Sequence, residues 1–249
     1  DLCNRLGLDT ISASSVIAFA MEAFERGVLS QESSGGLALT WGNAEAIVSL
    51  LSQMAYRQGV GDLLADGARL AAQRLGHSSQ EYAIHVKGLE MAFHDPRAFT
   101  SMAVGYATAN RGGCHLETLS HFVETGIMSG PAIGFDKPYD IHGVENKAEI
   151  AVLMQNYMCV FNGLGLCKFM MRGGATPAIL AEWTNLATGW NLTGDDLMHI
   201  GERIFNSMRV HAVQLGISRK DDFLPPRLMT LARPSGGAAG CWKGLSPWR

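Results

Sequence analysis

Apolar residues recur along this chain at the three- and four-residue spacing that places them on one face of an α-helix. The range 16–26 is typical, because its apolar stripe ends at Gly27, a common helix-terminating residue. The same spacing predicts helices over 16–26, 44–59, 63–75, 100–109, 145–161, from Pro177 onward and over 194–215. Only the range 83–91 favours a strand. We therefore expect a mainly α fold with at most two short strands.

A break in this pattern at Asp95-Pro96-Arg97 divides the chain. Proline disfavours helical backbone in the residue before it and removes a hydrogen-bond donor. We expect two helical subdomains, over 1–92 and 93–249, which pack together with a cofactor-binding cleft between them. Asp95 and Arg97 could form a salt bridge within the chain or contact a ligand, and the salt bridge is the favoured interpretation. The Gly- and Pro-rich stretches 126–143 and from 219 onward predict irregular loops.

The composition excludes several classes of protein. Hydrophobic residues make up 47% and charged residues 17% of the 249 positions, which is typical of a packed globular chain. The formal net charge of -3 argues against nonspecific nucleic-acid binding, which needs clustered Lys and Arg. No uncharged apolar run reaches the roughly 18 residues of a membrane span, and no signal peptide is visible. We expect neither nucleic acid nor membrane as a partner.

The cysteine usage indicates a compartment. Five cysteines, an odd number without regular spacing, argue against a disulfide framework. Such usage is typical of a reducing environment, so we expect a cytoplasmic location. The chain begins at Asp1 rather than Met, only a few residues before the first motif described next. We expect it to be a piece of a longer protein.

Two similar motifs are the strongest local signals. Asn162-Gly163-Leu164-Gly165-Leu166-Cys167 follows an apolar helical run, and Asn4-Arg5-Leu6-Gly7-Leu8-Asp9 repeats its frame near the start of the chain. Glycine permits positive φ, and consecutive backbone N–H groups in such a bend can bind an anion, with Lys168 adding positive charge. A thiolate at Cys167 could ligate a soft metal or an iron–sulfur cluster. For one motif alone a helix end with a buried cysteine is the simpler interpretation, but the duplication favours two loops that hold a shared ligand.

His115 is the main candidate for acid–base chemistry. It follows a Gly-Gly bend and Cys114, just after a predicted helix, where an imidazole can move protons near neutral pH. Arg111 in the same segment could hold an anion. His121 is the alternative, at helical spacing from two glutamates, Glu117 and Glu124, a pattern that also fits a solvated helix face. A zinc site is disfavoured because the chain has no C-x-x-C pair.

These motifs together resemble the C-terminal two domains of the tungsten-containing aldehyde ferredoxin oxidoreductases. That family carries two pterin-binding D-x-x-G-L-[CD] loops, which the two motifs above would match. The resemblance runs over nearly the whole chain, through Trp41-Gly42-Asn43, Gly59-Val60-Gly61-Asp62-Leu63-Leu64, His85-Val86-Lys87-Gly88-Leu89-Glu90, Asp95-Pro96-Arg97, Tyr106-Ala107-Thr108, Arg111-Gly112-Gly113-Cys114-His115-Leu116, Gly201-Glu202-Arg203-Ile204-Phe205-Asn206, Arg219-Lys220-Asp221-Asp222 and Leu224-Pro225-Pro226-Arg227.

The resemblance implies that two helical domains close over tungsten, or molybdenum, held by two pterin dithiolenes. An N-terminal β domain absent from this chain would cover the other side. Cys167 would be the fourth ligand of a 4Fe-4S cluster, with the other three cysteines in a C-x-x-C-x-x-x-C run before Asp1. His115 would be the family's active-site histidine, with His121 left open by a loop-length difference. The cofactor contacts would come from both loops and their neighbours: Asn4, Leu8, Asp9, Asn162, Leu166, Cys167, Lys168 and Arg111.

The implied activity is oxidation of aldehydes to carboxylic acids, with electrons passed through the cluster to ferredoxin in an anaerobic metabolism. Family members are often homodimers. Both motifs here start with Asn where the family usually has Asp, which keeps an acceptor but loses a charge. Two alternatives therefore stay open. One is the catalytic subunit of a benzoyl-CoA reductase-like enzyme acting on an aromatic acyl-CoA, and the other is a non-catalytic helical or iron–sulfur module without pterin.

Overall fold

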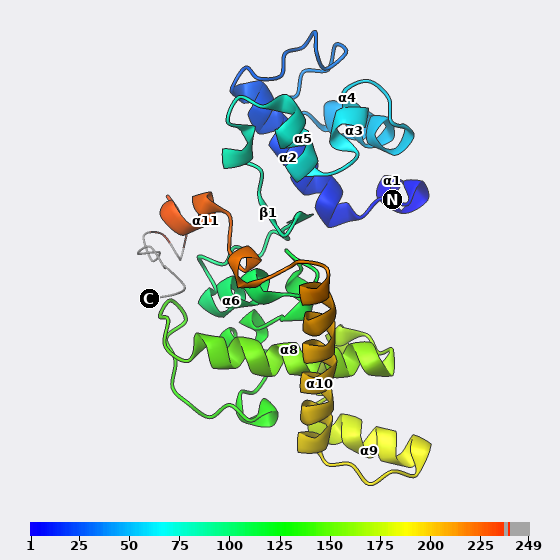
Figure 1. Ribbon diagram of the computed structural model, residues 1–249, viewed down its shortest axis with the longest axis vertical. Helices are drawn as coiled ribbons and strands as arrows, with labels where there is room; N and C mark the ends of the chain where they lie inside the picture. Colours follow the sequence, from blue (N-terminus) through cyan, green and yellow to red (C-terminus); the bar gives the residue numbers. More distant parts are fainter. Residues whose placement is uncertain (237–238, 240–249) are drawn as a thin grey trace. The chain divides into compact units, whose positions relative to one another are not determined.

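The computed structural model describes residues 1–236 and residue 239 (Figure 1). The part of the chain that it describes is mainly helical, which confirms the predicted fold class. The elements are, in chain order, α1 (Leu2–Leu6), α2 (Thr10–Glu25), α3 (Ala44–Tyr56), α4 (Val60–Leu64), α5 (Ala68–Leu75), the 3-10 helix η1 (Ser79–Glu81), β1 (His85–Val86), β2 (Leu89–Glu90), α6 (Thr100–Thr108), η2 (His115–Glu117), α7 (His121–Glu124), η3 (Pro131–Ile133), α8 (Lys147–Leu164), η4 (Lys168–Gly173), α9 (Pro177–Thr188), α10 (Gly194–Gln214), η5 (Arg219–Asp221) and α11 (Pro226–Thr230).

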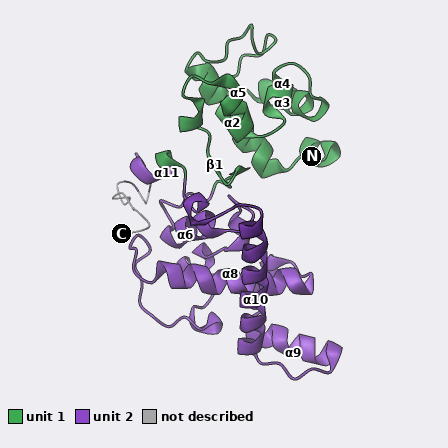
Figure 2. Cartoon of the chain, viewed as in Figure 1, with its two compact units in different colours: residues 1–93, 225–227 green, residues 94–224, 228–249 purple. Residues whose placement is uncertain are grey.

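The chain forms two compact units, shown in different colours in Figure 2. Unit 1 contains residues 1–93 and 225–227, and unit 2 contains residues 94–224 and 228–249, of which 237–238 and 240–249 lie outside the described residues. The predicted subdomains over 1–92 and 93–249, and the cleft between them, stay predictions. Each unit is described below by itself.

The core of unit 1 forms around α2, which packs against α3, α4 and α5. The prediction of one helix over 63–75 is wrong, because the structure has two helices there, α4 and α5, which are separated at Gly67. Gly67 has φ 90°, and the following Ala68 N–H donates to Glu90 Oε1 at 2.7 Å. A Cβ at Gly67 would lie 2.7 Å from that same oxygen. A buried carboxylate from a distant part of the sequence therefore caps α5 and ends the helical continuity.

The predicted strand over 83–91 is a two-stranded antiparallel hairpin with its turn in the middle. His85 pairs with Glu90 and Val86 with Leu89. The turn residues Lys87 and Gly88 have φ values of 54° and 92°, as a two-residue turn of the tightest hairpins requires. Two short strands are thus present among the described residues, as expected.

Unit 2 is organised by α8, whose sides pack against α6 and α10 (Figure 1). The contact with α10 is close at Gly201, where an added Cβ would lie 2.1 Å from the Asn156 carbonyl oxygen. Helix α10 begins at Gly194, as predicted, and Thr193 caps it, because Thr193 and Asp196 exchange side-chain and backbone hydrogen bonds in a capping box. Helix α9 begins at Pro177, also as predicted, and Thr176 is its cap.

The segment after 219 was expected to be irregular, but its described part contains η5 and α11. The correction has a physical cause, because these turns are fixed by contacts that sequence periodicity does not report. Arg209 donates two hydrogen bonds to Asp222, at 2.9 and 2.8 Å. Arg227 donates two to Glu22, at 2.7 and 2.6 Å, and this pair lies within unit 1.

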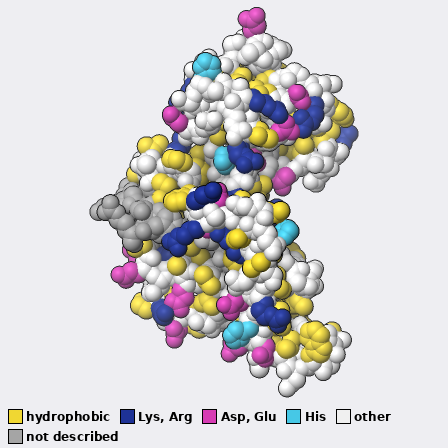
Figure 3. Space-filling view, in the orientation of Figure 1, with side chains coloured by type: hydrophobic (Ala, Val, Ile, Leu, Met, Phe, Trp, Pro, Cys, Tyr) yellow, Lys and Arg dark blue, Asp and Glu magenta, His cyan; other side chains and the backbone are white. Residues whose placement is uncertain are grey.

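Charged side chains of both signs are interspersed on the face drawn in Figure 3. Several charges form exposed ion pairs, such as Lys137 with Glu149 at 2.7 Å. Such pairs contribute about 0–1 kcal/mol each, because water screens them. Asp95 and Arg97 form the expected salt bridge within the chain, at 2.8 Å.

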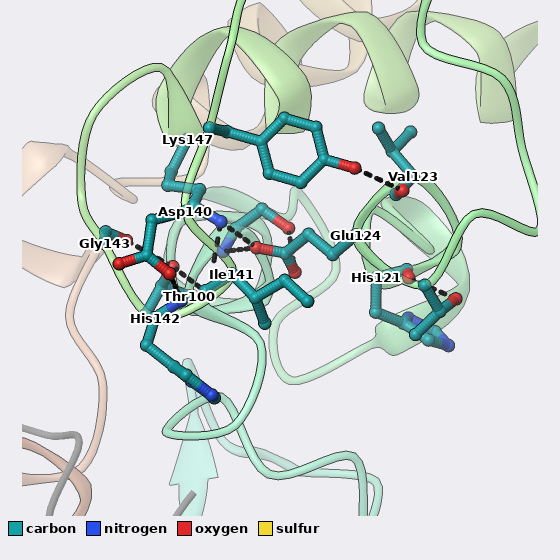
Figure 4. Close-up of polar contacts among 12 residues, drawn as sticks. Thr100, His121, Val123, Glu124, Asp140, Ile141, His142, Gly143 and Lys147 are labelled. Carbon is teal, nitrogen blue, oxygen red and sulfur yellow. Dashed lines mark hydrogen bonds and ion pairs between the residues drawn. The ribbon is translucent and has the colours of Figure 1, made fainter.

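A different ion pair lies inside unit 2, and Figure 4 draws it. The side chains of Glu124 and Lys147 are 0% and 2% exposed, with Lys147 Nζ 2.5 Å from Glu124 Oε1. The carboxylate also accepts from the Ser101 N–H at 3.2 Å and the Ser101 hydroxyl at 2.7 Å. Lys147 Nζ donates to the Ile141 carbonyl at 3.2 Å and lies 5.0 Å from the centre of the Tyr139 ring. One charge pair therefore joins the starts of α6 and α8 to α7.

Candidate functional site

The two sequence motifs form the same helix-ending turn. Gly7 ends α1 with φ 69° and ψ 25°, and Gly165 ends α8 with φ 68° and ψ 25°. The N–H of the following leucine reaches back in both copies, from Leu8 to the Cys3 carbonyl at 2.9 Å and from Leu166 to the Phe161 carbonyl at 3.0 Å. This is the Schellman arrangement, in which left-handed glycine satisfies the last helical carbonyls.

The residue after each turn also has the same conformation, although the side chain differs. Asp9 has φ -66° and ψ 126°, and Cys167 has φ -68° and ψ 124°. Asp9 caps α2 by accepting the Ser12 N–H at 2.7 Å. Cys167 is a free, exposed thiol at the start of η4. The simpler interpretation of a helix end with a buried cysteine is therefore wrong, because the turn carries Cys167 out of the core.

The first motif borders a cavity of about 280 Å³ inside unit 1. Gly7, Leu8 and Asp9 form one wall, while the others come from α2, α3, the junction of α4 and α5, and the hairpin. Asp66 on that junction is paired with two arginines, whose hydrogen bonds lower its pKa to about 2. The charge that Asp66 brings to the lining of this cavity is therefore already balanced. Asn4 is exposed one turn before the glycine.

The second motif is tied to the histidine segment through Lys168. Its Nζ donates to the Leu116 carbonyl at 2.6 Å, which fixes η4 against η2. Burial lowers the pKa of Lys168, while the nearby Cys114, Glu117 and Cys159 act in the opposite direction. The cation expected to lie beside the glycine bend is thus held partly inside unit 2.

Arg111 and Asn162, the other polar candidates of this region, are both exposed. Arg111 lies close enough to Lys168 for its positive charge to lower the pKa of Lys168 further. Leu166 is half-buried against the core of unit 2. The structure therefore brings Arg111, Asn162, Leu166, Cys167 and Lys168 into one region of unit 2, while Asn4, Leu8 and Asp9 belong to unit 1.

A second cavity, of about 330 Å³, lies in unit 2 next to this region. Both histidine candidates line it, and so does a third histidine that the sequence analysis did not single out. Phe169 and Arg172 of η4 line it too, directly after Cys167 in the sequence. The remaining lining residues are Leu119 and Phe122.

The rings of the three histidines of this cavity lie close together, with His94 in the middle. The His94 ring lies 4.8 Å from the ring of His115, nearly parallel at 16°, and 4.8 Å from that of His121. His121 Nδ1 lies 3.4 Å from Met102 Sδ. Burial, followed by the positive charges of His94, His115 and Arg172, lowers the pKa of His121 to about 4. Burial also lowers the pKa of His94, so both imidazoles are neutral near pH 7.

His94 immediately precedes the Asp95-Pro96-Arg97 break. This position was the only feature of the sequence that could have identified His94 as a candidate site residue. Its Nδ1 is buried and finds no hydrogen-bond partner among the described residues. A buried imidazole nitrogen without a partner is costly in a purely structural role.

The pattern that placed His121 on a solvated face is wrong. His121, Glu117 and Glu124 are 6%, 7% and 4% exposed. The glutamates are buried because each accepts a backbone N–H, Glu117 from Asn110 at 2.9 Å and Glu124 from Ser101. Helical spacing in the sequence could not show these partners, since they lie in other elements.

The residues present fit an iron–sulfur cluster only as part of a larger ligand set. Across residues 1–236 and 239, no group of three or more His, Cys, Asp or Glu side chains is arranged to hold a metal ion. Among the described cysteines, Cys167 is the exposed one, and it directly follows the glycine turn, so it is a suitable single ligand for a cluster completed by other residues. The two turns fit pterins through their carbonyls, because the N–H groups of Leu8 and Leu166 are used inside the turns.

No described helix is both long enough and apolar enough to cross a membrane.

Comparisons with known proteins give consistent results. The family model described as "Aldehyde ferredoxin oxidoreductase, domains 2 & 3" matches residues 1–245. The tungsten-containing aldehyde ferredoxin oxidoreductase of Pyrococcus furiosus is 35% identical over 243 residues, which cover 96% of this chain and 38% of that protein. The protein of the same name from Thermococcus kodakarensis is 34% identical over 242 residues, covering 96% and 38%. The chain thus spans little more than a third of the length of these curated relatives.

Two further similarities concern proteins with other substrates. The aliphatic sulfonate oxidoreductase, WOR-like subunit, of Pyrococcus furiosus is 30% identical over 251 residues, covering 96% of this chain and 35% of that protein. Among solved structures, the active-site complex BamBC of benzoyl coenzyme A reductase with 1,5-dienoyl-CoA matches with a TM-score of 0.67 and 20% identity. That match covers 91% of this chain and 39% of the other, and at this identity it shows a shared fold.

Proposed function

The chain belongs to the aldehyde ferredoxin oxidoreductase family, and from this premise we propose that it forms the helical part of a tungsten-containing enzyme oxidising aldehydes to carboxylic acids. The supporting observation is the geometric identity of the two turns, one ending in an exposed carboxylate and the other in an exposed thiol. A pair of equivalent cofactor-binding turns explains this identity, whereas two unrelated helix ends do not require it.

The net reaction converts an aldehyde and water into a carboxylate, three protons and two electrons. The tungsten–pterin group, when bound, supplies the two-electron chemistry, as cofactors do in such enzymes. The chain's own residues bind and orient. Leu8 and Leu166 offer carbonyls to pterin N–H groups, while the free oxygen of Asp9 and the amides of Asn4 and Asn162 offer further hydrogen bonds.

Cys167 is proposed as one thiolate ligand of a 4Fe-4S cluster whose other ligands lie outside this chain. Arg111 and Lys168 would add positive charge beside the cofactors, which favours anionic clusters and pterin phosphates. Ferredoxin is the proposed electron acceptor. The proposed assembly includes an N-terminal β domain, is cytoplasmic and forms a homodimer.

His115 is the proposed proton-transferring residue. It lines the 330 Å³ cavity, and its ring is held by the stack on His94. A histidine at hydrogen-bond distance from a bound carbonyl can polarise it or accept a proton. His121 has the same cavity but a lowered pKa of about 4, so it holds a proton poorly at neutral pH. The lowered pKa of His121 argues against that residue as the proton-transferring group.

The test uses the full-length protein purified without oxygen. We expect tungsten on elemental analysis and dye reduction with a panel of aldehydes. Molybdenum instead of tungsten would change the metal but keep the reaction. Turnover of an aromatic acyl-CoA without aldehyde turnover would indicate the benzoyl-CoA reductase-like alternative. A cluster signal without pterin would indicate a non-catalytic module, and either of these last two results would overturn the proposal.

The role of Cys167 has its own readout. Cys167→Ser should lower the iron content and alter the electron paramagnetic resonance signal of the reduced cluster, because one of its thiolates is lost. Cys3→Ser, a change to a half-exposed thiol in α1, is the matched control and should leave both unchanged. An unaltered signal in the Cys167 variant would remove this residue from the cluster.

A further inference from the structure

The histidine-lined cavity of unit 2 carries positive charge without a matching negative charge. The proposed proton transfer by His115 does not require this imbalance. Among its lining residues the only permanent charge is the guanidinium of Arg172, and no lining side chain is acidic. Burial, with nearby positive charges, lowers the pKa of His121, and burial lowers that of His94, so these imidazoles add no charge near pH 7. The fixed charge among the lining residues of the cavity is therefore positive.

Arg172 is placed to bind an anion. Its guanidinium lies 5.3 Å from the centre of the Phe122 ring, and within the described residues it forms no ion pair with a carboxylate. The face of an aromatic ring attracts a guanidinium, whose planar group still has N–H donors for a second partner. Two of these donors can pair with the two oxygens of a carboxylate.

Apart from the three histidines and Arg172, the lining residues of the cavity are apolar, and two of them are aromatic. Phe122 and Leu119 are buried beneath the cavity, whereas Phe169 is 55% exposed at its edge. A volume of about 330 Å³ is at the small end for ligand sites. Its dimensions and aromatic walls suit a small ring or short chain rather than an extended molecule.

We propose that this cavity is a binding subsite for a small organic acid with an aromatic or apolar body, whose carboxylate pairs with Arg172 and whose body packs against Phe122 and Phe169. The inference rests on the proposed function, because aldehyde oxidation makes such a carboxylate. It adds that the substrate is small and apolar, and that its acid product is held by ion pairing.

The experiment measures ligand binding to the full-length, cofactor-loaded protein by calorimetric titration with benzoate and with its neutral analogue benzamide. We expect benzoate to bind about tenfold more tightly, as hydrogen bonds to a charged group imply. Equal affinities of the unaltered protein for the two ligands would overturn the inference without any variant. Since binding is read directly, benzoate preference without aldehyde turnover would contradict the proposed function alone.

Variants then distinguish the contribution of the Arg172 charge to binding from that of the apolar contacts. Arg172→Gln should reduce the preference for benzoate to within about twofold, whereas Arg172→Lys should keep part of it. Phe169→Ala should weaken benzoate and benzamide alike, because it removes a shared apolar contact. The matched control is Arg203→Gln, which removes an exposed charge on α10 of the same unit. A benzoate preference that survives Arg172→Gln, or is lost equally in Arg203→Gln, would refute the role of Arg172.

Discussion

At the scale of single residues, the most consequential group is the fully buried Glu124 carboxylate. It accepts hydrogen bonds from the Ser101 backbone and hydroxyl and from Lys147, so three segments depend on one charge (Figure 4). Buried charges are tolerated only when every partner is present. The stability of unit 2 therefore depends on the Glu124 carboxylate. The helical periodicity of the sequence gives no sign of this.

Replacing this carboxylate should destabilise the protein strongly. Glu124→Gln leaves the Lys147 ammonium buried without a counter-charge, a loss of about 3–5 kcal/mol in the free energy of unfolding. Urea denaturation followed by circular dichroism measures it. The matched control is Glu149→Gln, which breaks the exposed pair with Lys137 and should change that free energy by no more than about 1 kcal/mol. Similar effects of the two changes would contradict this account of the buried pair.

His121 should make stability depend on pH. Its pKa is about 4 in the folded chain, against 6.5 for the free side chain, because burial disfavours the charged ring. Between these values the unfolded chain binds a proton that the folded chain does not. Stability is therefore complete above about pH 6.5 and falls as pH decreases towards 4.

The corresponding experiment compares unfolding free energies from pH 7 to pH 4 in the unaltered protein and in His121→Phe. The variant should have a shallower slope over that window, by up to one proton. The exposed His199 provides the control, since His199→Gln should keep the original slope. A His121 variant with an unchanged slope would show that this imidazole is not buried in the neutral form.

At the scale of elements, small residues determine how closely helices approach. Gly201 on α10 lies against the backbone of Asn156 on α8. Gly105 on α6 similarly faces the side chain of Thr118, with a contact of 2.4 Å to an added Cβ. The first contact holds α10 against α8, and the second holds α6 against the end of η2, the 3-10 helix that contains His115.

Gly201→Ala should separate α8 and α10 despite the higher helix propensity of alanine. Its Cβ would meet backbone atoms, which cannot rotate away, so we expect a loss of about 1–3 kcal/mol, larger than the gain of about 1 kcal/mol in propensity. Gly173→Ala is the control, because nothing lies within 4 Å of its added Cβ. Thermal unfolding of both variants measures the difference, and a stabilised Gly201→Ala would show that the crossing is looser than described.

At the scale of the whole molecule, the chain returns to unit 1 after completing most of unit 2. Residues 225–227 belong to unit 1, and Arg227 donates two hydrogen bonds to Glu22 across 205 positions of sequence. Burial alone would raise the pKa of Glu22, but its hydrogen bonds with Arg227 and Arg26 lower it. Unit 1 is therefore completed by a segment that follows most of unit 2 in the sequence.

Arg227→Met should weaken unit 1 selectively. Hydrogen bonds to charged groups contribute about 1.5–3 kcal/mol when partly buried, so amide hydrogen exchange should increase in α2 while α8 stays protected. Arg26 pairs with the same Glu22 carboxylate but is 48% exposed, so Arg26→Met should have an effect of about 0.5 kcal/mol or less. Equal exchange changes in α2 and α8 would show that the two units do not open independently.

The sequence alone determined the helical class, several helix ends and the family. Capping signals at Thr176 and Thr193 and the glycines of the two motifs are local, because their hydrogen bonds close within a few residues. The paired motifs could likewise be recognised by their spacing, since backbone conformation at Gly7 and Gly165 follows from glycine itself.

Only the tertiary structure decided which residues share a site. It divided the predicted helix at Gly67 through a hydrogen bond from Ala68 to Glu90, and it buried Glu117 and Glu124 by pairing them with distant N–H groups. It also placed His94 and Arg172 in one cavity, although 78 positions separate them. Burial, pKa and pairing depend on neighbours far apart in sequence, and helical periodicity reports only those one turn away.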